Sequence, residues 1–219
     1  MVTYEMLRQN ADINTYITRA DESLSALGFT EHSFPHVCRV AQLAGEILTT
    51  LGYSEREVEL ARIAAYLHDI GNLVNRSDHS QSGAVMAFRI LDHMDMEAGD
   101  IATVVTAIGN HDEGTGVPVN AVAAALILAD KSDVRRNRVR NRDIATFDIH
   151  DRVNYSVEHS RLKILPEERL AWLELKVDTQ FSSVMDFFEI FMKRMLLCRR
   201  AAERLGLRFQ LTINGQQLI

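Results

Sequence analysis

Two apolar runs in the first 135 residues of the chain end on side chains that are costly to bury. The run ARIAAYL is followed directly by His68 and Asp69, and the run AVAAALILA is followed by Asp130. An unpaired carboxylate inside a protein costs several kcal/mol, so such residues are normally paired or bound to a metal. His36 falls on a helical apolar stripe that also carries Val40. Three separate segments therefore bring a histidine or an aspartate to the boundary of one core.

The sequence up to residue 148 has the pattern of an α-helical domain. Apolar residues recur at helical spacing, and N-cap residues and glycines mark the ends of the segments. Ser54 and Glu57 form a capping box, for example, and Gly52 ends the preceding helix. We expect helices over residues 4–26, 33–52, 54–71, 80–94, 98–110 and 118–131.

The pattern changes near residue 149. Residues 153–164 and 169–178 alternate between apolar and polar side chains as half-buried strands do, with a hairpin loop at 166–168. An amphipathic helix over 183–205 and a last strand, RFQLTI, follow. The predicted fold is therefore mainly α, with a helical domain over 1–148 and a small α+β appendage over 149–219. The appendage could cover a cavity as a lid, or pair across a two-fold axis to form a homodimer.

The composition favours a soluble cytoplasmic protein. The net charge of −6 disfavours general binding to nucleic acid or a membrane surface. No apolar stretch approaches the roughly 20 residues that span a bilayer, and the polar first residues do not resemble a signal peptide. Cys38 and Cys198 lie in apolar-periodic segments and are expected to be buried thiols in a reducing compartment.

The types of the buried polar residues favour a transition-metal site. Any one of them alone is more often a satisfied core histidine or a helix-end aspartate. Imidazole nitrogen and carboxylate oxygen together suit iron, manganese, zinc or nickel, whereas carboxylates alone suit magnesium or calcium. Adjacent His68 and Asp69 point about 100° apart on a helix. At a helix end, where Gly71 lets the backbone turn away, both can face one cavity.

Several short motifs extend this pattern. His36, the pair His68-Asp69 and Asp130 match the H…HD…D signature, and LHDIGN, HSQSGA, GNHDEGTGVP and LILADKSD follow in the same order within residues 33–135. In these residues the sequence resembles the HD superfamily of metal-dependent phosphohydrolases. The resemblance implies an HD-type helical domain and the hydrolysis of phosphate esters or anhydrides.

The resemblance also implies a set of metal ligands. Two-metal members add two histidines between the HD pair and the last aspartate, and His79 and His111 stand at those places. Asp69 would then bridge two ions. The other reading of His79 and His111 is that they are ordinary helix-end residues. One or two divalent ions are expected, with iron or manganese first and zinc, nickel or magnesium as alternatives. His32, His93, His150 and His159 match nothing in the motifs and are taken as ordinary surface or core residues.

The chain departs from the family pattern at two places. Many members carry a lysine after HDIG, where this chain has Asn72. The HD-GYP branch has paired histidines and a glycine-tyrosine-proline turn, where this chain has Asn110-His111 and Gly116-Val117-Pro118. These differences speak against a third metal and against specificity for cyclic di-GMP. The arrangement is closer to enzymes that split dinucleoside tetraphosphates.

A basic segment follows the last aspartate of the motif. Residues 131–142 contain a lysine and five arginines in an otherwise acidic protein. Arginine forks match phosphate oxygens, so Lys131, Arg135 and Arg136 are candidate phosphate-binding residues. A solvated basic face is the alternative for this segment.

These features together predict a hydrolase of a small phosphorylated substrate such as a nucleotide. A metal-bound hydroxide would be the nucleophile, with Asp69 as the central ligand and Asp112 or Lys131 in proton transfer. A nucleotide-binding sensor with a degraded site is the main alternative, and a di-iron oxygenase is a lesser one. Motifs for a phosphate loop or a serine nucleophile are absent.

Overall fold

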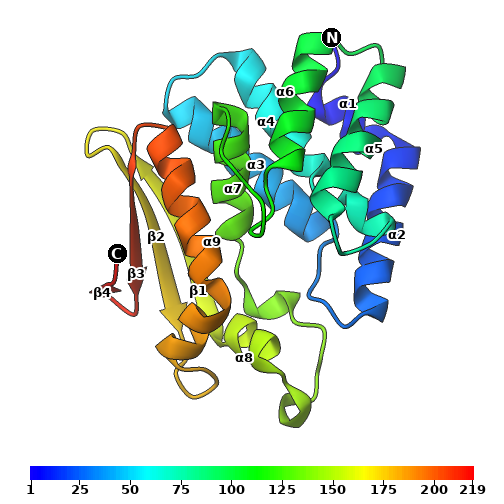
Figure 1. Cartoon of the computed structure of the whole chain (residues 1–219). Coiled ribbons are helices and arrows are strands. Elements are labelled where there is room, and N and C mark those ends of the chain that lie inside the picture. Colours follow the sequence, from blue (N-terminus) through cyan, green and yellow to red (C-terminus); the bar gives the residue numbers. More distant parts are fainter.

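A computed structural model describes all 219 residues of the chain as a bundle of helices with a small sheet at its side (Figure 1). The helices of the first part are α1 (Tyr4–Gln9), α2 (Ala11–Ala26), α3 (Phe34–Thr50), α4 (Glu55–Leu67), α5 (His79–His93), α6 (Ala98–Gly109) and α7 (Ala121–Lys131). Short 3-10 turns follow at η1 (Ile70–Leu73), η2 (Arg136–Arg138) and η3 (Ile144–Thr146). The second part contains α8 (Ile149–Ser156), β1 (Val157–Leu165), β2 (Leu170–Val177), α9 (Val184–Arg204), β3 (Arg208–Ile213) and β4 (Gln216–Gln217). The predicted fold class, mainly α with a C-terminal α+β appendage, is confirmed.

Local signals in the sequence set most of the helix ends. Ser54 and Glu57 form the predicted capping box of α4, and Ser33 is the N-cap of α3 with a proline directly inside. Gly52 takes a positive φ of 77° after α3, which a glycine adopts without steric cost. None of the helices combines the length and the apolar character that a bilayer crossing requires.

The predicted helix over 54–71 ends already at Leu67, before the 3-10 turn η1. Three other boundaries differ because a polar side chain caps a helix. Asn10 accepts backbone N–H bonds from α2, so the predicted helix over 4–26 is two helices. Asn120 caps α7, which therefore begins at Ala121 and not at residue 118. Asp148 caps α8, so the first residues of the predicted strand over 153–164 are helical and the strand begins at Val157.

The sheet has the strand order β1-β2-β3-β4. β1 and β2 form the predicted antiparallel hairpin, whereas β2 and β3 are parallel and are joined by α9. Along β2, Ala171, Leu173 and Leu175 are buried, and the alternate residues, including Trp172, are partly exposed or exposed. Trp172 donates from its indole nitrogen to Thr212 and lies under the Lys163 ammonium, so it is outside the appendage core.

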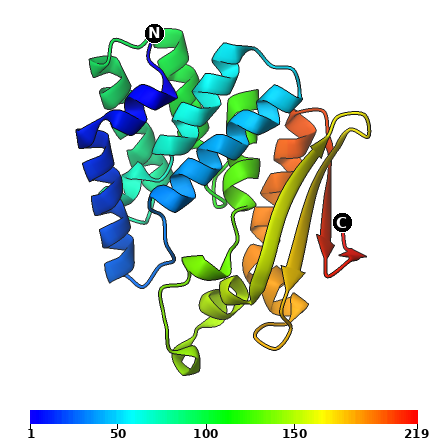
Figure 2. The ribbon, with the colours of Figure 1, turned by 180° about the vertical axis from the view of Figure 1, so that it is seen from behind.

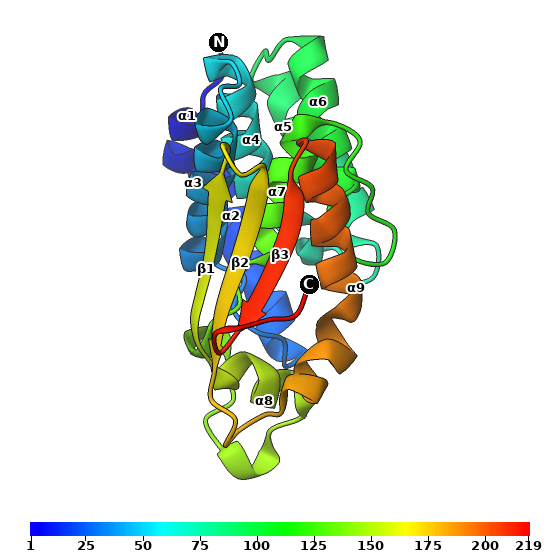
Figure 3. The same ribbon diagram turned by 90° about the vertical axis from the view of Figure 1, so that its left-hand side faces the viewer.

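One hydrophobic core extends through the whole molecule. A continuous cluster of 53 buried residues runs from Val2, which precedes α1, to Ile213 in β3. α9 packs against α7 on one side and against β2 and β3 on the other, as Figures 2 and 3 allow the reader to follow. Both cysteines are free thiols; Cys198 is buried in this core and Cys38 is half-buried. The division into domains at residues 148 and 149 stays a prediction, since the two parts share their core.

Candidate metal centre and its cavity

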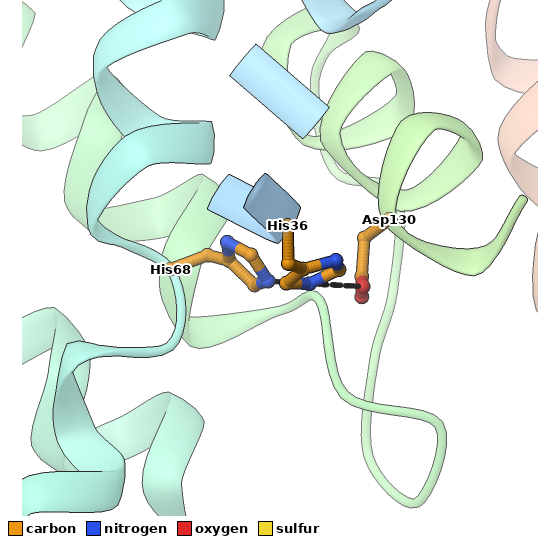
Figure 4. A group of neighbouring side chains, drawn as sticks. All are labelled: His36, His68 and Asp130. Atoms are coloured by element: carbon orange, nitrogen blue, oxygen red, sulfur yellow. Dashed lines mark ion pairs between the residues drawn. The ribbon is translucent and has the colours of Figure 1, made fainter. Parts of the chain in front are cut away.

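Six side chains of metal-ligand type meet where five helices of the bundle end or begin. All six are the residues that the sequence predicted as ligands, and all are buried. They are His36 in the first turn of α3, His68 and Asp69 directly after α4, His79 at the start of α5, His111 after α6, and Asp130 near the end of α7. Figure 4 shows three of them converging from α3, α4 and α7. The structure thus brings the predicted ligand set together.

The backbone after α4 explains how adjacent residues reach one place. His68 keeps helical dihedral angles, and Asp69 leaves the helix with φ −94° and ψ 0°. The following turn, η1, lies directly against the start of α5. A Cβ atom at Gly71 would lie 2.0 Å from the backbone oxygen of His79 and 2.4 Å from the amide nitrogen of Gly83. A glycine at residue 71 is therefore what allows α5 to bring His79 next to Asp69.

The first group of ligand atoms has the spacing of a coordination shell. His36 Nε2 and His68 Nε2 lie 3.4 and 3.7 Å from Asp130 Oδ1. The same two nitrogens lie 3.5 and 3.1 Å from Asp69 Oδ2. Ligands bound to one ion at about 2.1 Å are about 3.0–3.5 Å apart in octahedral or tetrahedral geometry. These four side chains are therefore placed to hold one ion.

A second group lies on the other side of Asp69. His79 Nε2 is 3.6 Å from Asp69 Oδ1 and 3.3 Å from His111 Nε2. His68, Asp69 and His111 also offer ligand atoms within 4.8 Å of one another. The carboxylate of Asp69 thus turns one oxygen to each group, which is the arrangement of a bridging ligand.

Two buried nitrogen atoms show that the site fits a metal ion. The Nε2 atoms of His36 and His68 are buried and make no hydrogen bond. Their Nδ1 atoms are held from behind by Asp133 Oδ2 at 2.8 Å and by the carbonyl oxygen of Ala65 at 2.7 Å. The Nδ1 atom of His111 is held in the same way by the carbonyl oxygen of Ile108 at 2.6 Å. Imidazoles fixed through one nitrogen, with the other turned to a common point, are characteristic of metal ligands.

The protonation of the cluster follows from its dense negative charge. Burial would lower the pKa of His68, but the carboxylates of Asp69 and Asp130 raise it to about 10. Burial would raise the pKa of both carboxyl groups, and the neighbouring cations hold them well below their usual range. The site thus attracts positive charge. Burial lowers the pKa of His79 and, more strongly, of His111, so both imidazoles are neutral at pH 7, as ligands must be.

A polar cavity of about 400 Å³ opens over the ligands. It has 21 lining residues, of which only four are hydrophobic. Small-molecule pockets are usually lined by apolar side chains, so this lining favours a charged ligand. The appendage contributes part of the wall through Asn154 of α8 and Ile190, Phe191 and Arg194 of α9.

Comparison with known protein families identifies the family of the chain. The HD domain family matches residues 34–152, more than half of the chain, and the match includes all six ligand residues. The protein belongs to the HD domain family. This family consists of metal-dependent hydrolases, and the histidine and aspartate clusters of the chain could hold a metal ion.

This HD domain protein is similar to a protein of an archaeon and to a bacterial protein of known structure. The uncharacterized protein MJ1020 of Methanocaldococcus jannaschii is 27% identical to it, over 73% of this chain and 70% of that protein. The crystal structure of a predicted HD superfamily hydrolase from an uncultured Thermotogales bacterium is 25% identical, with a TM-score of 0.45. The match to that structure covers 62% of this chain and 75% of the other.

The two residues predicted to act in proton transfer lie in the wall of the cavity. Asp112 and Lys131 line the cavity. The ammonium group of Lys131 is held 2.7 Å from Asp130 Oδ2 and 3.7 Å from Glu113 Oε1. Lys131 is therefore already paired with two carboxylates.

Arg135 and Arg136 do not line the metal-centre cavity, which corrects their predicted role in phosphate binding. The guanidinium of Arg135 donates to both carboxylate oxygens of Asp133. That of Arg136 donates to the carbonyl oxygen of Tyr155 and stacks on the Tyr155 ring. Both arginines line a separate groove at residues 135–158. The turn after α7 leads the chain away from the cavity before Arg138 returns to it.

Several further residues line the cavity that the sequence motifs did not indicate. Arg76, Arg138 and Arg194 line the cavity, as do His32 and His150, which match nothing in the sequence motifs. His32 and Arg76 lie within or beside the family motifs, but their residue types alone do not distinguish them from surface residues. Arg194 is outside the family match altogether.

Asn72, which replaces the lysine found in many members, is buried and orients the bridging ligand. Its amide donates to Asp69 Oδ1 at 3.0 Å and to the Asp69 carbonyl at 2.8 Å. Its own oxygen accepts from Arg76 Nη1 at 3.3 Å. The substitution of lysine by asparagine therefore does not leave a gap in the site.

Proposed function

We propose that the protein is a metal-dependent phosphohydrolase that cleaves a phosphate ester or anhydride in a nucleotide-like substrate. The observation that carries the proposal is that the cavity over the six-residue ligand cluster is lined by four of those ligands, Asp69, His79, His111 and Asp130, and by four basic side chains. Those cations are Arg76, Lys131, Arg138 and Arg194.

The balance of charge in the cavity supports an anionic substrate once ions are bound. The lining contains six carboxylates and four permanent cations, an excess of two negative charges. Two divalent ions would turn this into an excess of two positive charges. The metal-free cavity thus suits cations, and the loaded cavity suits a phosphate dianion.

Each part of the ligand set has a distinct role in the proposal. His36, His68 and Asp130 would hold one ion, His79 and His111 the other, and Asp69 would be shared. When bound, the ions would act as Lewis acids that polarise a phosphoryl oxygen and lower the pKa of a coordinated water from 15.7 towards about 7.

The remaining residues would position groups and transfer a proton. Asp133 and Asn72 hold His36 and Asp69 in their orientations. Asp112 accepts the Gly114 N–H with Oδ2, and its other oxygen has no partner in the protein. We therefore assign proton transfer to Asp112 Oδ1.

The outer cavity supports the nucleotide-like part of the substrate. The four hydrophobic lining residues are Leu27, Phe29, Ile190 and Phe191. Phe29 is 39% exposed, and the Arg76 guanidinium lies 5.4 Å from the centre of its ring. Apolar side chains in an otherwise polar cavity would bind a flat organic group attached to the phosphate.

The test is elemental analysis of protein purified without added metal or chelator, followed by a screen of phosphate esters with the metal found. About two equivalents of iron or manganese per chain are expected, as in other two-metal sites. Asp69→Ala should lose both metal and hydrolysis, because the variant lacks the shared ligand. Asp92→Ala, which removes an exposed carboxylate of α5, is the matched control.

Hydrolysis that survives in Asp69→Ala would exclude the proposal. Tight nucleotide binding by the loaded protein without any turnover would favour the sensor, and product formation that requires dioxygen would favour an oxygenase.

A further inference from the structure

α9 brings a basic residue of the appendage into the cavity of the HD domain. Arg194 lies 42 residues beyond the end of the family match, yet it lines the cavity together with the metal ligands Asp69, His79 and Asp130. We propose that Arg194 binds the phosphate group of the substrate, so that the appendage completes the binding site. This inference rests on the proposed function and extends it to a residue outside the HD domain.

The guanidinium of Arg194 is fixed on two sides. Its Nε donates to Glu113 Oε1 at 2.7 Å, and its central carbon lies 4.0 Å from the centre of the Phe191 ring. Phe191 is 97% buried, so this ring is a fixed platform. A guanidinium held by stacking and by one hydrogen bond loses little freedom when it binds a ligand.

The two terminal nitrogens of Arg194 remain free. Neither Nη atom donates to any protein group, and the side chain keeps 20% of its surface exposed. Neither atom is among the buried polar atoms without a partner. The paired N–H groups of the fork are thus open to a ligand in the cavity, in the geometry that binds two phosphate oxygens at once.

Arg194 is connected to the metal ligands by short contacts. Glu113 Oε1, which accepts from Arg194, lies 3.7 Å from the Lys131 ammonium, and Lys131 is 2.7 Å from Asp130 Oδ2. One Glu113 carboxylate therefore lies between two cations. Asp130 also pairs with Lys131, so a phosphate bound at the ions would find the free terminal nitrogens of Arg194 beside it and not the ammonium of Lys131.

The other cations of the cavity are less available than Arg194. Lys131 is held by Asp130 and Glu113. Arg138 donates to the carbonyl oxygens of Glu31 and Asp133. Arg76 uses one terminal nitrogen to hold Asn72. Among the four, Arg194 is the one whose whole terminal fork is free while its base is fixed.

The experiment measures binding of inorganic phosphate to the metal-loaded protein by calorimetry, so that no turnover is needed. Arg194→Gln should weaken phosphate binding by about tenfold or more, because a bidentate charge-assisted contact is lost. Arg194→Lys, which keeps the charge next to Glu113 but not the fork, should give an intermediate loss. Metal content and the midpoint of thermal unfolding should remain those of the wild type.

Two further variants separate binding from a structural role. Glu113→Gln should tighten phosphate binding, because it removes a negative charge from the cavity that repels phosphate and keeps an acceptor for Arg194 Nε. Arg199→Gln is the matched control, since Arg199 lies on the same helix, is 53% exposed and is outside the cavity.

Unchanged phosphate binding in Arg194→Gln, or a loaded wild-type protein that does not bind phosphate, would overturn the inference. So would an equal loss in Arg194→Gln and Glu113→Gln, because it would show that only the ion pair matters. If phosphate binding changes as expected while no phosphate ester is hydrolysed, the proposed function fails and the assignment of Arg194 stands.

Discussion

The orientation of His36 depends on a single carboxylate that lies 97 residues away in the chain. Asp133 Oδ2 is 2.8 Å from His36 Nδ1 and leaves Nε2 turned to the other ligands. Burial would raise the pKa of the Asp133 carboxyl, but the bonds from His36 and Arg135 hold it well below its usual range. Asp133 is thus an ionised partner that keeps the imidazole in the tautomer a metal requires.

Replacement of this carboxylate should weaken metal binding without removing a ligand. We expect Asp133→Asn to lower metal affinity by about 10–100-fold, the usual effect of losing such a partner. Titration of the metal-free protein with manganese measures it. Asp92→Asn is the matched control, because it makes the same change at an exposed carboxylate of α5. An affinity equal to that of the wild type in Asp133→Asn would show that His36 needs no such support.

Single residues also show where sequence reasoning ends. The ligand residues could be predicted for two reasons. Histidines and aspartates interrupt apolar runs, and the motifs that contain them occur in a known order. Asp133 is the last residue of the motif LILADKSD and Arg138 follows it, but the sequence does not show which polar residues of this segment turn inward. Arg135 was chosen for its nearness to Asp130 in the chain, whereas its guanidinium is directed to Asp133.

The contact between η1 and α5 determines whether the second group of ligands forms. Gly71 has no positive φ, so its role is steric. The backbone of α5 occupies the space that a Cβ atom would need. The sequence indicated a glycine at which the backbone turns, and the structure shows that close approach is the reason for it.

A methyl group at this contact should displace α5. We expect Gly71→Ala to destabilise the protein by about 1–3 kcal/mol, as overpacking does, which lowers the unfolding midpoint by several degrees. Because His79 begins α5, the metal content should also fall from two equivalents towards one. Gly109→Ala is the control, since a Cβ atom there would meet only ordinary contacts, such as Ala84 at 3.7 Å. A full second equivalent in Gly71→Ala would contradict this account.

At the scale of elements, amphipathic periodicity predicted every long helix, and alternation predicted all three main strands. Apart from the end of α4, the errors lie at helix starts. Asn10, Asn120 and Asp148 cap helices there, and apolar spacing alone would extend these helices or omit them. Capping depends on the local path of the chain, which periodicity does not report. The parallel pairing of β2 with β3 is set by how α9 packs, and no local signal encodes it.

The whole molecule should be less stable without its ions. The metal centre buries two carboxylates among four imidazoles, and ions that bind only the folded state stabilise it, by about 2.7 kcal/mol at a hundredfold excess over the dissociation constant. Dialysis against a chelator should therefore lower the unfolding midpoint, and added manganese should restore it. Calorimetry of the two forms checks this, with magnesium as a poorer ion for an imidazole site. Equal midpoints would mean that the folded protein holds no ion.

The position of α9 between α7 and the sheet also decides how fast a ligand can exchange. α9 is packed on both sides, so the appendage cannot swing outward without breaking the common core. The exposed lining residues are residues 27–29, which precede α3, and Asp148 and His150 at the start of α8. Ligand exchange must therefore follow local loop motions, which take nanoseconds to microseconds, and not the slower closure of domains. Product release in such a molecule would not be limited by a moving lid.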